Sequence, residues 1–354
     1  MSHPVYLLGA RGLLAGEFLR LLADHPGLHL AGAFARSGEG TLGSCHPQLA
    51  TPLAAQPVHD AKDLLSALTK AEQPVLVLAL PHGASGPWWA EHRAELELRC
   101  PALVVADLSA DFRLEDATSY ASHYQLSHAC PDELGQWSYG LPELHPIAAG
   151  TKRIATPGCF ATALQLAILP FAHAGQLDYS RPWIAQGITG SSGSGAVPKP
   201  GTHHPHRAMN FHAYGLQGHR HEAELLAPRS GLAGTPELDF TPHSAPVSRG
   251  IHLHAVLPLA ASLHGQDQFD PQQTLDSFCA PHAFLEASSS APQIRYVAGS
   301  NRVQIHAYRR GTSLHCLLAL DNTIKGGAGQ ALQCLNLALG FAETTALPSS
   351  GLAY

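Results

Sequence analysis

The chain has 354 residues, of which 45% are hydrophobic and 14% are charged. At about 150 residues per domain this length predicts two domains, and the hydrophobic content excludes a disordered or fibrous protein. The net charge of -6, with no cluster of lysine and arginine, argues against a nucleic-acid partner.

The cysteines and the longest uncharged stretch indicate the cellular compartment in which the protein is expected. Seven cysteines are scattered along the chain without a C-x-x-C pair, which is typical of reduced thiols in a cytoplasmic protein. The stretch 154–177 lacks charge but contains two prolines and two glycines, so we do not expect it to span a membrane. We therefore expect a cytoplasmic protein without a membrane partner.

The first half of the chain alternates short apolar runs with helical patterns. A run at 5–8, an amphipathic stretch at 14–23 and a run at 28–35 predict a βαβ unit. Two more runs at 75–80 and 102–108 flank a helical stretch at 88–99. The runs are continuously apolar, which favours a parallel sheet covered on both faces.

The pattern changes after about residue 150. A helix at 159–171 and a strand at 183–189 precede a loop at 190–206 that is rich in Gly, Ser, Pro and His. Alternating runs then predict an antiparallel sheet with one exposed face; they span 251–259, 303–308 and 313–320. The last helix, 328–341, is nearly all Ala, Leu, Gln and Cys without a charge, which predicts a buried helix that docks back on the first domain.

A glycine turn follows the first strand. Gly9, Gly12 and Ala15 form a G-x-x-G-x-x-A pattern that opens the first helix, where backbone N–H groups and the helix N-terminus favour a pyrophosphate. A tight turn without a ligand is the alternative. The second strand ends at Arg36 and Ser37, and a guanidinium with a hydroxyl suits a ribose 2′-phosphate, which favours NADP over NAD.

The segment Thr156-Pro-Gly-Cys159 places a cysteine in the first turn of a helix. The positive end of the helix dipole lowers the pKa of a thiol there, so Cys159 is a candidate nucleophile for covalent catalysis. A small buried residue that closes the helix N-terminus is the alternative.

His219 and His221 form a His-Arg-His segment that suits general acid–base chemistry. Six histidines fall between His203 and His221, which raises a metal site as a rival. Against it, His219 and His221 lack the i, i+4 spacing of zinc hydrolases, and no cysteine pair or acidic ligand lies among them. A polar, solvated loop is the other interpretation of His203–His206.

Three more stretches are predicted to form loops at strand ends of an α/β domain, where ligands gather. They contain Pro81 and His82, then Ser109 and Arg113, and then Glu143. A further segment, with Asn322 and Lys325, ends a strand and starts the terminal helix. Arg113 suits bidentate binding of a phosphate or carboxylate, with an exposed ion pair as the alternative. The glycines after Lys325 allow close approach to a ring, or simply form a strand-to-helix turn.

In their order along the chain, these segments resemble the N-acetyl-gamma-glutamyl-phosphate reductases, a family of the semialdehyde dehydrogenase group with glyceraldehyde-3-phosphate dehydrogenase-like architecture. The most specific matches are Pro157-Gly-Cys159, His219-Arg-His221, Asp321-Asn322 and Lys325-Gly326. The resemblance implies an α/β fold: a Rossmann domain with a doubly wound parallel sheet (1–155), an α+β catalytic and oligomerisation domain (156–322), and a terminal helix (323–354) that returns to the Rossmann domain.

The resemblance further implies reductive dephosphorylation of N-acetyl-gamma-glutamyl phosphate in arginine biosynthesis, with NADP(H) as cofactor, inorganic phosphate as co-product and a homodimer or homotetramer. Cys159 matches the nucleophile; His219 is the favoured acid/base and His221 the second candidate. The expected cofactor-binding residues are Gly9, Arg11, Gly12, Leu13, Leu14, Arg36, Ser37, Pro81, His82, Asn322 and Lys325. The expected substrate-binding residues are Ser109, Arg113, Glu143 and Tyr214, and no metal is expected.

Four other functions compete with this one. Reduction of an aminoadipyl phosphate carried by an acidic protein is the nearest, although a net charge of -6 gives no sign of a basic docking surface. Aspartate-semialdehyde dehydrogenase fits the His-Arg-His and Lys-Gly segments less well. A zinc hydrolase built on the His203–His221 cluster and a non-catalytic NADP sensor are alternatives from different classes.

Overall fold

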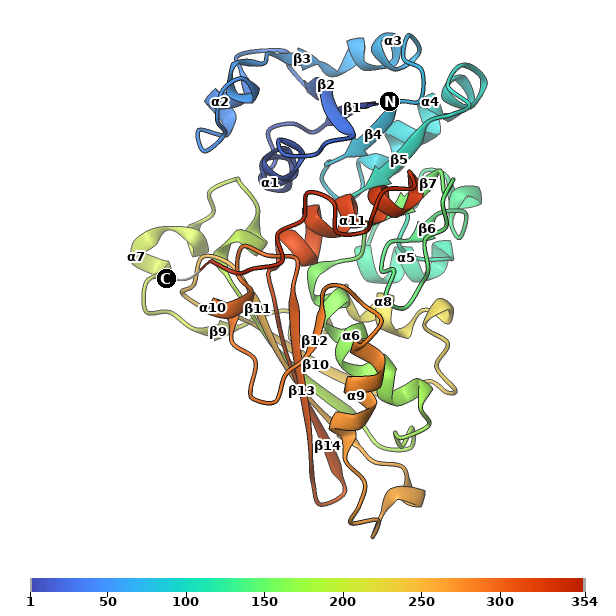
Figure 1. The fold of residues 1–354 in the computed structure, drawn as a ribbon, viewed down its shortest axis with the longest axis vertical. Coiled ribbons are helices and arrows are strands. Elements are labelled where there is room, and N and C mark those ends of the chain that lie inside the picture. The colour runs from blue at the N-terminus through green and yellow to red at the C-terminus, as the bar shows by residue number, and fades with distance from the viewer. Residues whose placement is uncertain (1, 353–354) are drawn as a thin grey trace. The chain divides into compact units, whose positions relative to one another are not determined.

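The computed structural model describes residues 2–352, which fold into two compact units (Figure 1). Unit 1 contains the residues up to Pro157 together with Gly327–Leu347, and unit 2 contains Gly158–Gly326 and the residues from Pro348 onward. Within 2–352, no helix combines the length and apolar character that a membrane span requires.

Unit 1 is built on a parallel sheet of seven strands in the order β3-β2-β1-β4-β5-β7-β6. The order reverses between β1 and β4, which is the doubly wound arrangement of a Rossmann domain. The strands are β1 (His3–Leu8), β2 (Leu28–Ala35), β3 (Val58–Asp60), β4 (Val75–Leu78), β5 (Val104–Asp107), β6 (Ser138–Tyr139) and β7 (Arg153–Ala155). The prediction of a parallel sheet is therefore confirmed.

Unit 1 contains both long and short helices. The longer ones are α1 (Leu13–Leu22), α4 (Ser85–Arg99), α5 (Ala117–Tyr124) and α11 (Gly329–Ala338), and the short ones are α2 (Leu42–Cys45) and α3 (Leu64–Leu68). Helix α11 packs against α1 and β5, so the prediction that the last helix docks back on the first domain is confirmed. The final described residues leave unit 1: the Leu352 amide donates to the carbonyl of Ala298.

Helix α11 is buried although its sequence includes three polar residues, Gln330, Gln333 and Asn336, all fully buried. Each has a partner: Gln330 donates to the Gly140 carbonyl at 2.7 Å, and Gln333 donates to Glu143 at 2.8 Å. Because buried amides are costly without partners, these bonds fix the position of the helix in unit 1.

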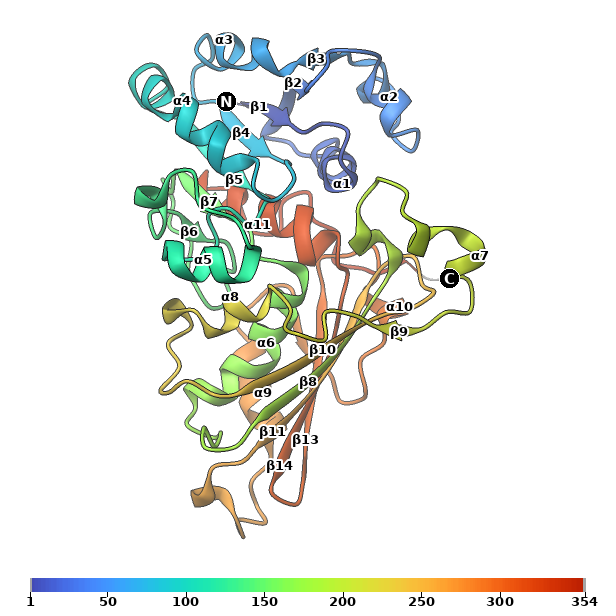
Figure 2. The same ribbon diagram turned by 180° about the vertical axis from the view of Figure 1, so that it is seen from behind.

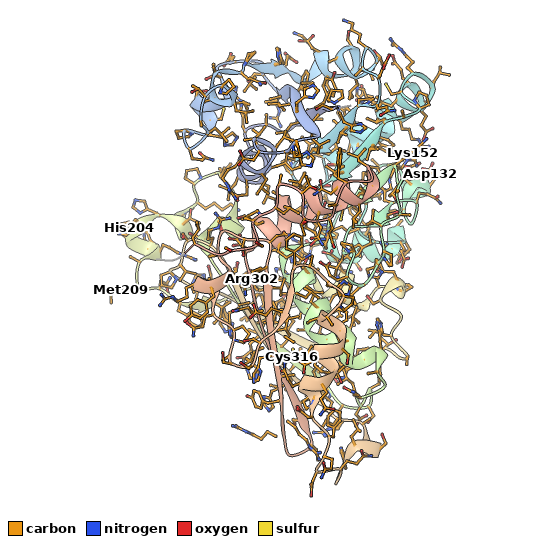
Figure 3. The ribbon with its side chains drawn as sticks, viewed as in Figure 1. Asp132, Lys152, His204, Met209, Arg302 and Cys316 are labelled. Atoms are coloured by element: carbon orange, nitrogen blue, oxygen red, sulfur yellow. The ribbon has the colours of Figure 1, made fainter. Side chains whose placement is uncertain are left out.

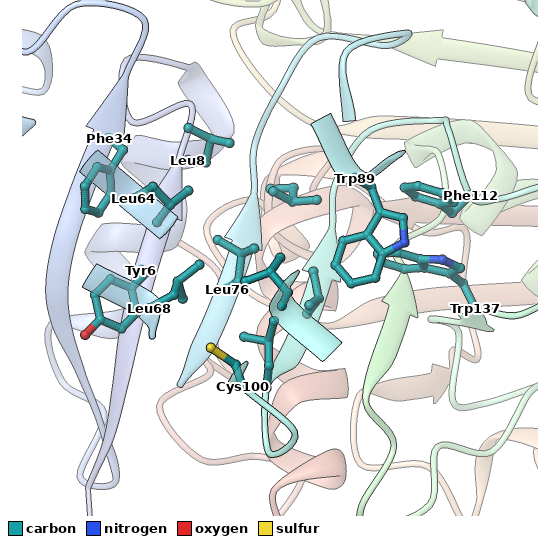
Figure 4. Packing of buried hydrophobic residues seen from close by; sticks show 14 of the residues in the cluster. Tyr6, Leu8, Phe34, Leu64, Leu68, Leu76, Trp89, Cys100, Phe112 and Trp137 are labelled. Carbon is teal, nitrogen blue, oxygen red and sulfur yellow. The ribbon is translucent and has the colours of Figure 1, made fainter. Parts of the chain in front are cut away.

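An aromatic core supports the sheet of unit 1 (Figure 4). Phe112 and Trp137 stack with ring centroids 4.0 Å apart, and Trp89 meets Trp137 edge-on at 5.2 Å. Beside them lies the buried carboxylate of Glu133, which accepts hydrogen bonds from Trp89 Nε1 at 2.9 Å and Trp137 Nε1 at 3.3 Å. Glu133 also pairs with Arg93 and Arg153. This one carboxylate therefore links α4, the β6 region and β7.

Unit 2 contains a second sheet of seven strands, in the order β12-β13-β14-β11-β8-β10-β9. They are β8 (Trp183–Thr189), β9 (His212–Ala213), β10 (Leu238–Ser244), β11 (Ile251–Pro258), β12 (Leu285–Ala287), β13 (Val303–Arg310) and β14 (Ser313–Leu320). The prediction of an antiparallel sheet was only partly right, because β10 pairs with β8 and β12 with β13 in parallel. We did not expect β10, since Pro242 interrupts its pattern.

Two helices cover one face of this sheet: α6 (Cys159–His173) packs on β11 and β14, and α9 (Pro271–Cys279) packs on β12 and β13. Figures 1 and 2 show both on the same side. Cys316, labelled on β14 in Figure 3, is wholly buried, which raises the pKa of its thiol. The short helices α7 (His204–Arg207), α8 (Glu222–Leu226) and α10 (Ile294–Val297) complete the unit.

We predict that Glu133→Gln destabilises the protein by about 2 kcal/mol, because a neutral amide weakens the charge-assisted hydrogen bonds that this buried carboxylate accepts from two indoles and two partly exposed arginines. Equilibrium denaturation in urea measures the change. Glu95→Gln is the matched control; Glu95 pairs with Arg99 on the exposed surface of α4, so its loss should cost less than about 1 kcal/mol. Equal stability of Glu133→Gln and the wild type would contradict the role assigned to Glu133.

Candidate active site

The candidate nucleophile Cys159 is the first residue of α6 and is partly exposed. Gly158 precedes it as the N-cap in an extended conformation and offers no side-chain cap. The N–H groups of the first turn therefore lack the partners that the helix interior has. A negative charge beside them is stabilised by these donors and by the helix dipole, which favours the thiolate.

Two glycines allow other groups to come close to this turn. A Cβ on Gly326 would lie 2.7 Å from Cys159 Cβ, and a Cβ on Gly158 would lie 2.4 Å from His221 Nε2. Real Cβ atoms do not approach so closely, so neither position accepts a side chain without a shift. Gly326 lies in a π-helix, Ile324–Ala328, a distortion frequently found at functional sites. The structure thus brings Cys159, His221 and the 324–328 segment together.

The two histidines of the His-Arg-His segment lie side by side, with ring centroids 4.7 Å apart. The His221 amide donates to His219 Nδ1 at 3.3 Å, and the His219 amide donates to Glu222 at 2.6 Å. Because Nδ1 accepts, the proton of neutral His219 is assigned to Nε2. Burial, aided by the positive charge of Arg220, lowers the pKa of His219 to about 4. His219 is therefore neutral at pH 7.

Tyr214 and Glu224 complete this cluster. Burial raises the pKa of Tyr214, and a negative charge on nearby Cys159 raises it further; its ring lies 5.9 Å from that of His219. Glu224 is fully buried and accepts a hydrogen bond from the Gly158 amide at 3.0 Å. Glu224 was not predicted from the sequence. Its signal was the second of two glutamates in a short helix that directly follows His221.

Asn322 and Lys325 have different surroundings in unit 2. Asn322 Oδ1 accepts from the Gly250 amide at 2.6 Å, and its Nδ2 donates to Ser192 Oγ at 3.0 Å. Lys325 is fully buried, with Nζ 6.0 Å from the ring centroid of Phe284.

Asp321 fixes the backbone of the turn that carries Asn322 and leads to Lys325. Its carboxylate pairs with Arg249 Nε at 2.7 Å and accepts from the Gly299 amide at 2.7 Å. It also accepts from the backbone of Thr323 and Ile324 at the start of the π-helix. A single buried carboxylate thus fixes the segment that carries Asn322 and leads to Gly326.

The predicted cofactor turn lies in unit 1 between β1 and α1. Gly9 has φ of +91°, and a Cβ there would lie 2.3 Å from the Ala79 carbonyl oxygen, so the turn requires glycine for both conformation and space. Gly12 is the N-cap of α1 and provides no side-chain cap, which leaves the first N–H groups of the helix, at Leu13 and Leu14, without a capping side chain.

Arg11 links this turn to the end of β2. Its guanidinium donates to the carbonyl of Glu39 at 2.6 Å and to that of Ser37 at 3.4 Å. Arg36 and Ser37 are both exposed. The structure therefore brings the glycine turn and the predicted 2′-phosphate residues together. The Arg11 guanidinium is already hydrogen-bonded to backbone carbonyls of the segment that follows β2.

A buried network holds the loop that follows β4. The Asp111 carboxylate accepts from the amides of Gly83 at 2.7 Å and Gly86 at 2.8 Å. Pro81 and His82, which precede these amides, are exposed. Asp107 is fully buried, and burial together with the charge of Asp111 raises its pKa to about 6. This network therefore holds the backbone of the loop that carries the exposed Pro81 and His82.

Three of the four predicted substrate-binding residues lie inside unit 1. Ser109 is fully buried and donates to Asp107 at 2.7 Å. Arg113 is 4% exposed and donates to the carbonyl of Thr156 at 2.7 Å, three residues before Cys159. Glu143 is 6% exposed and accepts from Gln333. Of the four, Tyr214 is the one in the Cys159 cluster.

The histidine-rich loop does not assemble a ligand set in the described part of the chain. Among residues 2–352, no three His, Cys, Asp or Glu side chains are arranged to hold one metal ion. His203, His204 and His206 lie at the exposed surface around α7, and Met209 just beyond is 98% exposed (Figure 3).

Comparisons with known proteins extend over the full chain. Residues 4–151 match the model of the semialdehyde dehydrogenase NAD binding domain, and residues 159–322 match that of the semialdehyde dehydrogenase dimerisation domain. An N-acetyl-gamma-glutamyl-phosphate reductase of Micrococcus luteus is 37% identical, with 100% of each chain covered. A Thermomicrobium roseum protein provisionally named [LysW]-L-2-aminoadipate 6-phosphate reductase is 34% identical over 99% of each chain.

Solved structures show the same fold at low identity. Aspartate semialdehyde dehydrogenase II of Vibrio cholerae, complexed with ASA, has a TM-score of 0.65 and 15% identity, covering 95% of this chain and 98% of that one. Aspartate semialdehyde dehydrogenase of Candida albicans with NADP has a TM-score of 0.59 and 14% identity, covering 95% and 98%.

We predict that the His219 imidazole remains neutral throughout the near-neutral and mildly acidic range and titrates near pH 4, because burial and Arg220 lower its pKa. NMR of the ¹⁵N-labelled protein, assigned with a His219→Gln variant, measures this and should find the proton on Nε2. Arg220→Gln is the control and should move the midpoint upward. A midpoint at the ordinary histidine value of about 6.5 would contradict the prediction.

Proposed function

The chain belongs to the semialdehyde dehydrogenase family, and we propose that it reduces N-acetyl-gamma-glutamyl phosphate to N-acetyl-glutamate semialdehyde, with NADPH as reductant and release of inorganic phosphate, in arginine biosynthesis. The chain is an oxidoreductase with a nicotinamide cofactor. The observation that carries the proposal is Cys159 at the N-terminus of α6, clustered with His221 and Tyr214, in a chain that matches such reductases from end to end.

The covalent step belongs to Cys159. Its thiolate attacks the acyl-phosphate carbonyl; a carbon–sulfur bond forms, the carbon–oxygen bond to phosphate breaks, and phosphate leaves a thioester on the enzyme. N–H groups of the first turn of α6 stabilise the oxyanion that develops during the attack. Because Gly158 and Gly326 carry no Cβ, the surrounding segments approach this turn closely.

The two histidines divide the proton chemistry. Neutral His219 carries its proton on Nε2 and has a pKa of about 4, so it acts as a hydrogen-bond donor to the carbonyl oxygen. His221, whose ring lies against Gly158, takes the proton of the Cys159 thiol. His219 remains the favoured residue for stabilising the substrate oxygen by this hydrogen bond, and His221 is the base for the nucleophile.

The glycine turn fits a dinucleotide. The open N-terminus of α1 after Gly12 suits a pyrophosphate, and Gly9, with its φ of +91°, forms the turn that leads into it. We assign Gly9, Gly12, Leu13 and Leu14 to the pyrophosphate, Arg36 and Ser37 to the 2′-phosphate, with Arg11 holding the two segments together. Pro81 and His82 line the same strand-end region, and Asn322 and Lys325 are proposed to support the nicotinamide. When bound, NADPH supplies the hydride that reduces the thioester.

We propose that one predicted substrate-binding residue contacts the substrate directly and that the other three act through neighbouring groups. Tyr214 lies beside Cys159 and is the direct contact. Ser109, Arg113 and Glu143 act from inside unit 1, because each is buried and already bonded to neighbouring groups. Arg113 positions the backbone of Thr156 and thereby the segment that leads to the nucleophile.

A carrier-linked aminoadipyl phosphate is the second candidate substrate, because one relative of 34% identity is named for that reaction. The dimerisation-domain match supports an oligomer, and we propose a homodimer or homotetramer. We also propose a cytoplasmic location, since the cysteines within residues 2–352 are thiols rather than disulfides.

The test of this function is the reverse reaction with N-acetyl-glutamate semialdehyde and NADP, followed by the absorbance of the reduced nicotinamide. Turnover should require inorganic phosphate and should be lost in Cys159→Ser, while NADPH binding persists. Cys279→Ala is the matched control, because burial raises the pKa of that thiol to about 12, and it should keep its activity. Comparable turnover by Cys159→Ser would reject the nucleophile, and turnover only with a carrier-linked aminoadipate semialdehyde would favour the second substrate.

We predict that Arg36→Ala weakens NADPH binding at least about tenfold more than NADH binding, because a lost charge-assisted contact to the 2′-phosphate is worth about 1.5–3 kcal/mol. Fluorescence titration of both cofactors measures the ratio. Arg99→Ala, an exposed arginine on α4, should bind both as the wild type does. Equal losses of affinity for NADPH and NADH in Arg36→Ala would contradict the 2′-phosphate assignment.

A further inference from the structure

Unit 1 contains a cavity at the edge of its sheet that lies opposite the glycine turn. Its volume is about 190 Å³, and it is lined by residues of α4, by the amino ends of β5 and β7, and by the residues just before these strands. The turn at Gly9 and the segment at Arg36 follow the carboxyl ends of β1 and β2. Because these strands are parallel, the cavity lies at the other edge of the sheet, outside the site assigned to the cofactor.

The walls of the cavity are mostly apolar. Leu96, Leu103 and Val105 line it together with the indole of Trp89, and each of these four side chains is at most 6% exposed. Trp89 and Cys100, which also lines the cavity, are labelled in the buried cluster of Figure 4. An apolar cavity of about 150 Å³ accepts benzene. This one therefore has room for an apolar group somewhat larger than a benzene ring.

Three charged side chains, Glu97, Lys152 and Arg153, also line the cavity. Arg153 pairs with both Glu97 and the buried Glu133, so its charge is already compensated. Lys152, labelled in Figure 3, is exposed, and its Nζ donates to the carbonyl of Pro101 at 2.7 Å. Among residues 2–352 no carboxylate forms an ion pair with Lys152. The charge that the cavity leaves uncompensated is therefore positive.

The Lys152 ammonium is available to a ligand. It has three donors, of which the Pro101 carbonyl accepts one. Pro101 itself lines the cavity, so this bond keeps the ammonium beside it. A single negative charge matches one ammonium through a charge-assisted hydrogen bond, whereas the nearby Glu97 carboxylate opposes a doubly charged phosphate. Sites for drug-sized molecules enclose about 300–1,000 Å³, so the cofactor is too large for this cavity.

We propose that the cavity is a second binding site of this chain, and that it takes a small carboxylic acid with an apolar body the size of a benzene ring. The body packs against Leu96, Leu103 and Trp89, and the carboxylate accepts a hydrogen bond from Lys152 Nζ. Neither the cofactor nor the acyl phosphate of the proposed reaction is assigned to this edge of the sheet. The site is therefore independent of the proposed function.

Methyl NMR of the full chain, labelled at Leu and Val, tests the proposal with hydrocinnamate as the probe. The signals of Leu96 and Leu103 should shift saturably, with a Kd of about 1 mM or lower. The signals of Leu13, at the proposed cofactor turn, should not shift with hydrocinnamate, and saturating NADPH should leave its Kd unchanged. Hydrocinnamamide lacks the charge and acetate lacks the apolar body, so each should bind at least about fivefold more weakly.

A charge variant tests the role of Lys152. Lys152→Met removes the ammonium and keeps a flexible chain, so the Kd for hydrocinnamate should rise at least about fivefold, while the Kd for the amide stays within about twofold. Lys70→Met replaces another exposed lysine of unit 1 and is the matched control, which should bind hydrocinnamate as the wild type does. Far-ultraviolet circular dichroism and NADPH binding check that both variants are folded.

Two results would overturn the site itself: the absence of a saturable shift at Leu96 and Leu103, or displacement of hydrocinnamate by NADPH. An equal Kd for hydrocinnamate in Lys152→Met and the wild type would overturn the carboxylate contact. None of these measurements uses turnover, so a failure of the proposed reaction is recognised separately from a failure of this site.

Discussion

The candidate active site depends on the absence of side chains at two positions around the first turn of α6. Gly158 leaves room for the His221 ring, and Gly326 leaves room for Cys159 itself. A methyl group at either place would collide with an atom of the reacting cluster at less than 3 Å. The close approach of these segments, more than any single hydrogen bond, determines which groups surround the nucleophile.

Buried carboxylates hold the loops that lead to this chemistry. Asp321 fixes the turn into the π-helix, Glu224 contacts the amide of Gly158, and Asp111 anchors the loop after β4. Asp321 and Asp111 each accept several hydrogen bonds from backbone or side-chain donors, which compensates for the cost of removing a charge from water. The chain thus uses charges inside its units to position backbone, while the groups proposed to meet ligands, such as Arg36 and His82, remain exposed.

Burial lowers the pKa of His219, and this low pKa determines the role that we propose for it in the reaction. An imidazole held neutral and bonded through Nδ1 presents an N–H group to a carbonyl oxygen without adding a positive charge beside the thiolate. Arg220 contributes to this state because its charge penalises the protonated ring. The adjacent histidines therefore have different environments although they are only two residues apart, and their roles follow from those environments.

The sequence by itself determined the elements with strong periodicity and the residues with distinctive chemistry. Strands β2, β8 and β14 have the predicted bounds, and Cys159 begins the predicted helix, because apolar pattern and turn residues are local signals. Tertiary structure decided the rest. The parallel pairing of β10 with β8, the burial of Ser109 and Arg113, the role of Glu224 and the cavity beside Lys152 all depend on residues distant in sequence. Such contacts leave no local pattern, so only the folded chain reveals which polar groups face ligands and which hold the fold.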